Sequence, residues 1–134
     1  MFTTDPRYKI PVSFGIDLAR HLAHMLDVKP AEFNLYVMVV KLDPHNESFR
    51  ILAADTEGEC DLNEHSFAGV AADVLQTFAQ TGKLPQDPSD SPAPYGHYVE
   101  NGIAAVVIGF NQPHHCEVIA TALVKEVLAA NIPG

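Results

Sequence analysis

Two stretches of the chain are apolar at nearly every position and rich in β-branched residues. They are residues 34–42, NLYVMVVKL, and residues 103–110, IAAVVIGF. A strand with this pattern is buried on both faces, whereas a half-exposed strand alternates apolar and polar residues. We therefore predict that these two strands lie side by side in the middle of a sheet that is covered on both faces.

Each of these strands has a more polar neighbour in the sequence. Residues 49–55 follow the first strand after the turn-rich link 43–48, and residues 95–100 precede the second, with Asn101-Gly102 between them. Asn-Gly between two strand-like segments is typical of a type I′ turn, which needs positive φ at both central residues. The pattern predicts two hairpins that form one antiparallel sheet, with 49–55 and 95–100 at its edges.

Three further segments repeat apolar residues at the helical spacing. The most regular is 63–80, and Thr81-Gly82 ends it. The first helix is predicted from about Ser13, as its N-cap, to Val28, and the last from Pro113 to about Ala130. In the first helix the apolar side chains are expected to face the core, which leaves a narrow polar strip of Asp17, Arg20, His21 and His24.

The predicted order of elements is α-β-β-α-β-β-α. A length of 134 residues suits one domain, 1–134, of the α/β (α+β) class, with an α-β-α arrangement in three layers. The second helix should cover one face of the four-stranded sheet, and the first and last helices the other. This order is similar to that of profilin-like and roadblock-like domains and of the small acidic secretion chaperones of type III systems. The resemblance to roadblock domains and chaperones implies a dimer that binds protein partners.

Residues 83–96 contain four prolines and are predicted to be an extended crossover. Such a segment either docks a partner or serves only as a rigid surface connection.

The charge balance restricts the partners. The chain has 17 acidic and 8 basic residues, a net charge of −9, which opposes binding to nucleic acid or to an anionic membrane. It has neither the apolar run of roughly 18 residues that a membrane helix needs nor the pattern of a signal peptide. We therefore expect a cytoplasmic protein, in which the two cysteines are free thiols.

The densest group of reactive side chains lies before and in the first turn of the last helix. Asn111, His114, His115 and Cys116 are candidate ligand-binding residues, together with His97 from the preceding hairpin. A thiol at a helix N-terminus meets the positive end of the helix dipole, which would lower the pKa of Cys116 and make it a nucleophile. The alternatives are an anion site at this helix end, or a Cys116 that packs as a small apolar residue.

A metal site is a further alternative. Cys60, His65, His115 and Cys116 together have the ligand types of a zinc site, although their spacing lacks the paired C-x₂-C pattern of structural zinc sites. His21 and His24 share a helix face, which suits either two metal ligands or a solvated polar strip. Without a stronger pattern, no cofactor is expected.

No complete catalytic motif is present, including G-x-S-x-G, H-E-x-x-H and the P-loop. Our leading hypothesis is therefore a small acidic binding or adaptor domain, forming a homodimer that recognises a protein partner or a small ligand. The alternative is a small enzyme or ligand-binding protein with its site at residues 111–116.

Overall fold

The computed structural model describes residues 6–29, 33–57, 63–84, 95–109 and 113–131, with the backbone alone for 63–66. Its elements follow the predicted order α-β-β-α-β-β-α, with two short 3₁₀ turns. They are η1 (Pro6–Tyr8), α1 (Lys9–Met25), β1 (Leu35–Asp43), η3 (Pro44–Asn46), β2 (Ser48–Glu57), α2 (Asn63–Thr81), β3 (Tyr95–Glu100), β4 (Ile103–Gly109) and α3 (Pro113–Ala130).

The sheet is antiparallel throughout and has the order β2-β1-β4-β3. The two central strands are β1 and β4, and every residue of β4 is buried, as its continuous apolar sequence predicts. The turn between β3 and β4 has positive φ at both Asn101 (51°) and Gly102 (78°), which confirms the Asn-Gly hairpin.

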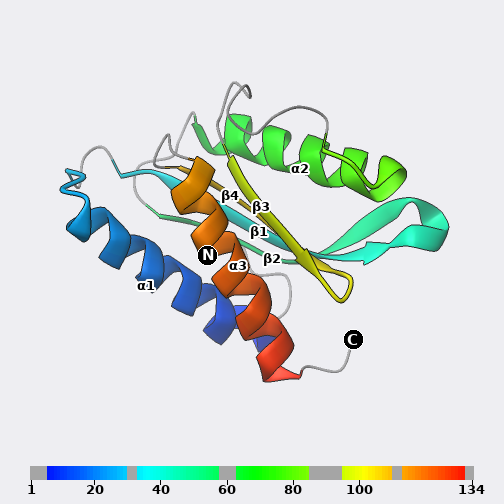
Figure 1. Ribbon diagram of the computed structural model, residues 1–134, viewed down its shortest axis with the longest axis horizontal. Helices are drawn as coiled ribbons and strands as arrows, with labels where there is room; N and C mark the ends of the chain where they lie inside the picture. The colour runs from blue at the N-terminus through cyan, green and yellow to red at the C-terminus, as the bar shows by residue number, and fades with distance from the viewer. Residues whose placement is uncertain (1–5, 30–32, 58–62, 85–94, 110–112, 132–134) are drawn as a thin grey trace.

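Helices cover both faces of the sheet (Figure 1). On one face, α1 and α3 pack together over a core that contains Val37, Val39 and Val107. On the other face, α2 crosses the sheet and packs against Tyr36, Met38 and other side chains. Because successive side chains of a strand point to opposite faces, each central strand supplies both cores.

The first helix differs from its predicted limits at both ends. It begins at Lys9 rather than Ser13, because Pro11 lies in the first turn, where a missing N–H removes no helical hydrogen bond. It ends at Met25 rather than Val28, because Asp27 adopts a left-handed conformation (φ 57°) that stops the helix.

The predicted proline-rich crossover, 83–96, lies mostly outside the described residues. Lys83 and Leu84 follow α2, and Tyr95 and Gly96 belong to β3 rather than to the crossover. In the described part of the chain, every helix is too short or too polar to cross a membrane.

Candidate functional site

The predicted cluster at the end of the chain lies where β4 leads into α3. His114, His115 and Cys116 occupy the first turn of α3, and Asn111 lies outside the described residues. Cys116 is completely buried, and its Sγ donates a hydrogen bond to the carbonyl oxygen of Gly109, 2.9 Å away. The thiol is therefore part of the core between the sheet and α3.

Close backbone packing seals this junction. A Cβ added at Gly96 on β3 would lie 2.0 Å from the backbone nitrogen of Glu117, so α3 rests directly on the strand. A Cβ at Gly109 would lie 2.6 Å from the carbonyl oxygen of Asn34, and Gly109 also has φ 150°. Gly96 thus allows the first turn of α3 to lie directly on β3, and Gly109 allows the end of β4 to lie close to the start of β1.

The predicted activation of Cys116 is wrong. Burial raises the pKa of the thiol from 9.0 to about 12, and the opposing effect of the backbone groups of Gly109 and Gly96 is smaller. Desolvation disfavours a charged thiolate more than the positive end of the helix favours it. The side chain of Cys116 is therefore an uncharged thiol at neutral pH. This agrees with the alternative that Cys116 packs as a small apolar residue.

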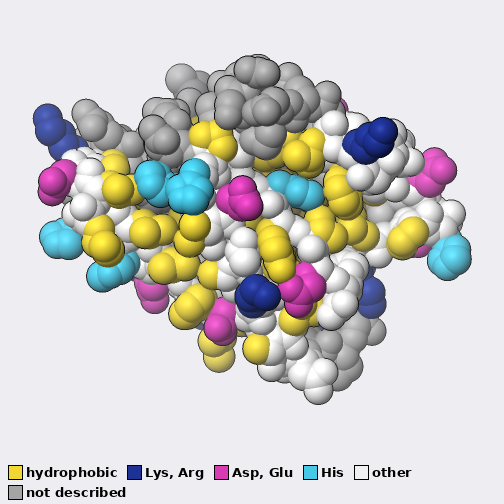
Figure 2. Space-filling view, viewed as in Figure 1, with side chains coloured by type: hydrophobic (Ala, Val, Ile, Leu, Met, Phe, Trp, Pro, Cys, Tyr) yellow, Lys and Arg dark blue, Asp and Glu magenta, His cyan; other side chains and the backbone are white. Residues whose placement is uncertain are grey.

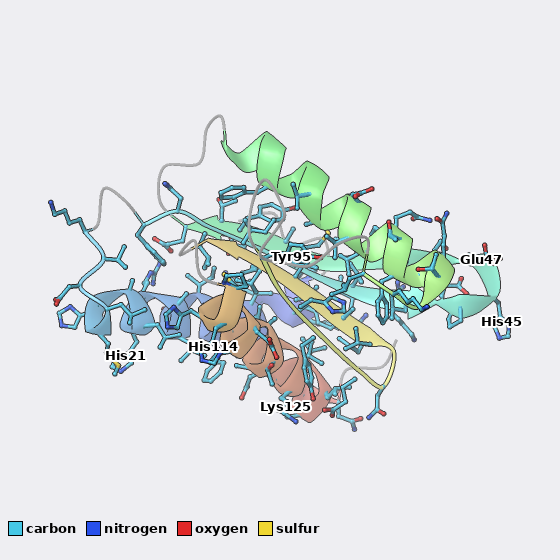
Figure 3. All side chains as sticks on the ribbon, turned by 45° about the horizontal axis from the view of Figure 1, so that its top comes forward. His21, His45, Glu47, Tyr95, His114 and Lys125 are labelled. Carbon is cyan, nitrogen blue, oxygen red and sulfur yellow. The ribbon has the colours of Figure 1, made fainter. Side chains whose placement is uncertain are left out.

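The histidines do not meet in one site. His114 is exposed and His115 is half-buried, with 5.6 Å between their ring centroids. His97 lies on β3 on the other side of the sheet, where its ring is 4.9 Å from Phe78 of α2. In Figure 3, His114 lies at the start of α3, whereas Tyr95, which precedes His97 by two residues on β3, lies on the side of α2.

His97 is the most perturbed of the described histidines. Burial lowers its pKa from 6.5 to about 4, and its Nε2 is buried without a hydrogen-bond partner among the described residues. The imidazole is therefore neutral at physiological pH and packs as an aromatic residue beside Phe78.

The proposed zinc ligands are only partly described. Cys60 and the side chain of His65 lie outside the described residues. Within those that are described, no three His, Cys, Asp or Glu side chains are placed to hold a metal ion. His21 and His24 both lie exposed on α1 without such a third ligand, which fits a solvated polar strip.

Two cavities of about 340 and 260 Å³ border Arg20 on α1. The guanidinium donates hydrogen bonds to Asp17 at 2.9 Å and to Glu57 of β2 at 2.5 Å. Arg20 therefore ties α1 to the edge of the sheet through Glu57, while Asp17 of the same helix holds the guanidinium from its other side. The smaller cavity is lined by all three of these charged side chains, whereas the larger one shares only Arg20 with them and is lined mainly by the C-terminal end of α1.

An exposed apolar surface is the feature that the sequence did not predict. On α1, Ile10 is 80% exposed, Phe14 44% and Met25 65%, although Phe14 and Met25 were expected to face the core. Figure 2 shows hydrophobic side chains along α1 with histidines beside them. When the helix is begun at Lys9, the helical period places Ile10, Phe14 and Met25 on one side. The buried Val12 and Ala19 lie on the opposite side. This spacing could have predicted the exposed surface from the sequence.

No protein-family model matches the chain, and no curated protein or solved structure is similar enough to count as a match. An inference about the function of this protein therefore has to come from its own sequence and structure.

Proposed function

We propose that the protein is a non-catalytic binding domain that acts as a homodimer, joined through the outer side of α1. The observation that carries this proposal is the exposed row of Ile10, Phe14, His21 and Met25, which we call the α1 row. Large apolar side chains exposed together on a helix are typical of a protein interface, whereas single ones are common on any surface.

The spacing of the α1 row favours a second copy of the same chain. The intervals between its four residues are four, seven and four, so the row reads the same in both directions. At 100° per residue the four side chains lie within about 60° around the helix. In a two-fold dimer with antiparallel helices, Ile10 would face Met25 of the other copy and Phe14 would face His21. A two-fold interface requires this self-complementary pattern.

The charge distribution favours the same surface. Residues 6–29 contain four of the eight basic residues of the chain and only two of its 17 acidic residues. Beside the α1 row, Asp17 is paired with Arg20. Two copies of a chain with a net charge of −9 repel each other, and this repulsion is weakest where the acidic residues are fewest.

Sedimentation velocity over a concentration series tests the proposal. We expect the wild-type protein to dimerise, and Phe14→Glu to weaken the dimer by about tenfold or more, because it places a carboxylate in an apolar contact. Ile51→Glu is the matched control, since Ile51 is similarly exposed (39%) but lies on β2. A wild-type monomer at every concentration would contradict the proposal, as would equal dimerisation by the two variants.

A charge pair tests the antiparallel register. Ile10→Glu alone should weaken the dimer, and adding Met25→Lys should restore it, because each carboxylate would then face an ammonium group on the other copy. Met25→Lys combined with Phe14→Glu, which do not face each other in this register, should give no such rescue.

A further inference from the structure

The larger of the two cavities beside Arg20 lies between the C-terminal half of α1 and the segment that leads into β1. His21, which is labelled in Figure 3, lies in this half of the helix. The cavity volume of about 340 Å³ falls at the lower end of the range of about 300–1,000 Å³ that is typical of small-molecule sites. The described residues that line it are Arg20, Ala23, His24, Asp27, Val28 and Phe33.

Three of the lining residues form an apolar part of the cavity. Ala23 and Phe33 are buried members of the core between α1 and the sheet, and the half-buried Val28 packs against that core. An apolar group placed against these side chains would be removed from water, which is favourable in proportion to the area buried. This part of the cavity therefore selects a ligand with an apolar body.

The other three lining residues are polar and exposed, and their charges are unequal. The guanidinium of Arg20 is compensated by the carboxylates of Asp17 and Glu57, two acids for one base. Asp27 forms no salt bridge with any residue in the described part of the chain, so its carboxylate adds a further negative charge beside His24. The polar part of the cavity therefore favours a cation.

We propose that this cavity binds a small molecule that combines an apolar ring with an ammonium group. The ring would occupy the part lined by Ala23, Val28 and Phe33, and the ammonium group would lie beside the Asp27 carboxylate. A hydrogen bond between two charged groups is stronger than a neutral one, which fixes the orientation of the ligand. The net charge of −9 attracts a cation to the protein and repels a carboxylate of the same shape.

The inference adds a ligand to the proposed binding role and does not depend on the dimer. At 100° per residue, Ala23 lies more than about 90° around α1 from every member of the α1 row. The monomeric Phe14→Glu protein should therefore bind the ligand as well as the wild-type protein does. A failure of ligand binding would leave the dimer unaffected, so separate measurements test the two proposals.

The probe is phenethylamine, titrated into the protein while the backbone amide signals are followed by NMR. We expect a Kd on the order of 1 mM or below, with the largest shifts at Ala23, His24 and Val28. 3-Phenylpropionate has the same ring and chain but carries a carboxylate, and it should bind at least about tenfold more weakly. Ethylamine has the ammonium group without the ring, and it should also bind at least about tenfold more weakly.

Asp27→Asn tests the ammonium contact. Asparagine keeps the shape of the side chain and tolerates the left-handed conformation of this position (φ 57°), so the variant should fold normally. It should weaken phenethylamine binding by at least about fivefold. Asp73→Asn, which makes the same change of charge at an exposed position of α2, is the matched control and should leave the affinity within about twofold.

Ala23→Leu tests the apolar part, because the larger side chain fills it. We expect phenethylamine to bind at least about tenfold more weakly, whereas Ala72→Leu, at a half-buried position of α2, should have little effect. The NMR spectra show whether each variant is folded, and if Ala23→Leu is not, the two aspartate variants decide. The proposal is overturned if phenethylamine does not bind or shifts signals elsewhere, if 3-phenylpropionate binds equally well, or if Asp27→Asn behaves like Asp73→Asn.

Discussion

Cys116 and Phe14 lie in two helices that cover the same face of the sheet, yet only one of them meets solvent. Around Cys116, the first turn of α3 carries reactive residue types, but Gly96 lets β3 pack directly against the backbone of this turn, and the thiol is buried. Around Phe14, the outer side of α1 carries mainly large apolar residues, and these are exposed. The comparison teaches that accessibility, more than residue chemistry, separates the buried first turn of α3 from the α1 surface that we propose as an interface.

The largest effect expected in this comparison concerns Gly96, whose replacement tests how tightly the junction is closed. Gly96→Ala should lower the free energy of unfolding by more than about 3 kcal/mol, because its Cβ would collide with the backbone of α3. Gly69→Ala on α2 is the control, since a Cβ there has nothing within 4 Å. It should stabilise the protein by about 0.5–1 kcal/mol, because alanine is the better helix former. Urea denaturation measures both, and equal effects would show that the junction is loose.

The next effect is a loss of stability in acid that originates at His97. The pKa of His97 is about 4 in the folded protein and 6.5 in the unfolded chain, so the unfolded chain binds the proton more readily. His97 therefore does not lower the free energy of unfolding above pH 6.5. As pH falls towards 4, protonation of His97 in the unfolded chain lowers this free energy by up to about 3 kcal/mol.

The variant His97→Phe isolates this contribution, because it keeps an aromatic ring beside Phe78 and removes the titration. Its stability, measured by urea denaturation from pH 7 to pH 4, should fall less than that of the wild-type protein. His45→Asn, at the exposed turn between β1 and β2, should leave the wild-type slope unchanged. Parallel slopes for wild type and His97→Phe would mean that His97 is accessible to water in the folded state.

A smaller effect concerns the thiol itself. In a Cys60→Ser background, Cys116 should react with iodoacetamide at least about 100-fold more slowly in the native protein than in urea, because the thiol is buried and uncharged. Cys116→Ser should cost about 1 kcal/mol, since a hydroxyl can still donate to Gly109 but fills less space. Rapid native-state labelling would place Cys116 in an open site and remove the contrast with α1.

The smallest effect is a gain in stability at the edge of the sheet. Arg50→Glu should stabilise the protein by about 0.5 kcal/mol, because it turns a repulsive cross-strand pair with Lys41 into an attractive one. The same substitution at Lys83, outside the sheet, should change stability less. If Arg50→Glu destabilises the protein, a neighbouring acid already neutralises the pair.

The fold was predictable because its signals are local. The continuous apolar runs place β1 and β4 in the middle of the sheet, and Asn101-Gly102 defines the second hairpin. The candidate site was less predictable. The position of Cys116 at a helix N-terminus was predicted correctly. Its reactivity, however, depends on how closely β3 packs against this turn, and that packing is made possible by Gly96, which is twenty residues away in the sequence. The first helix begins earlier than predicted, because Pro11 fits in its first turn, where its missing N–H removes no helical hydrogen bond.

The amino-acid sequence alone determined the order of elements, the two edge strands and the helices on each face, because hydrophobic periodicity and turn residues act over a few positions. Only the tertiary structure decided that Cys116 is buried, that the α1 row is exposed and that, among the described residues, no acidic side chain forms a salt bridge with Lys41 or Arg50. These properties arise from contacts between segments that are distant in the sequence, and solvent access is set by those contacts.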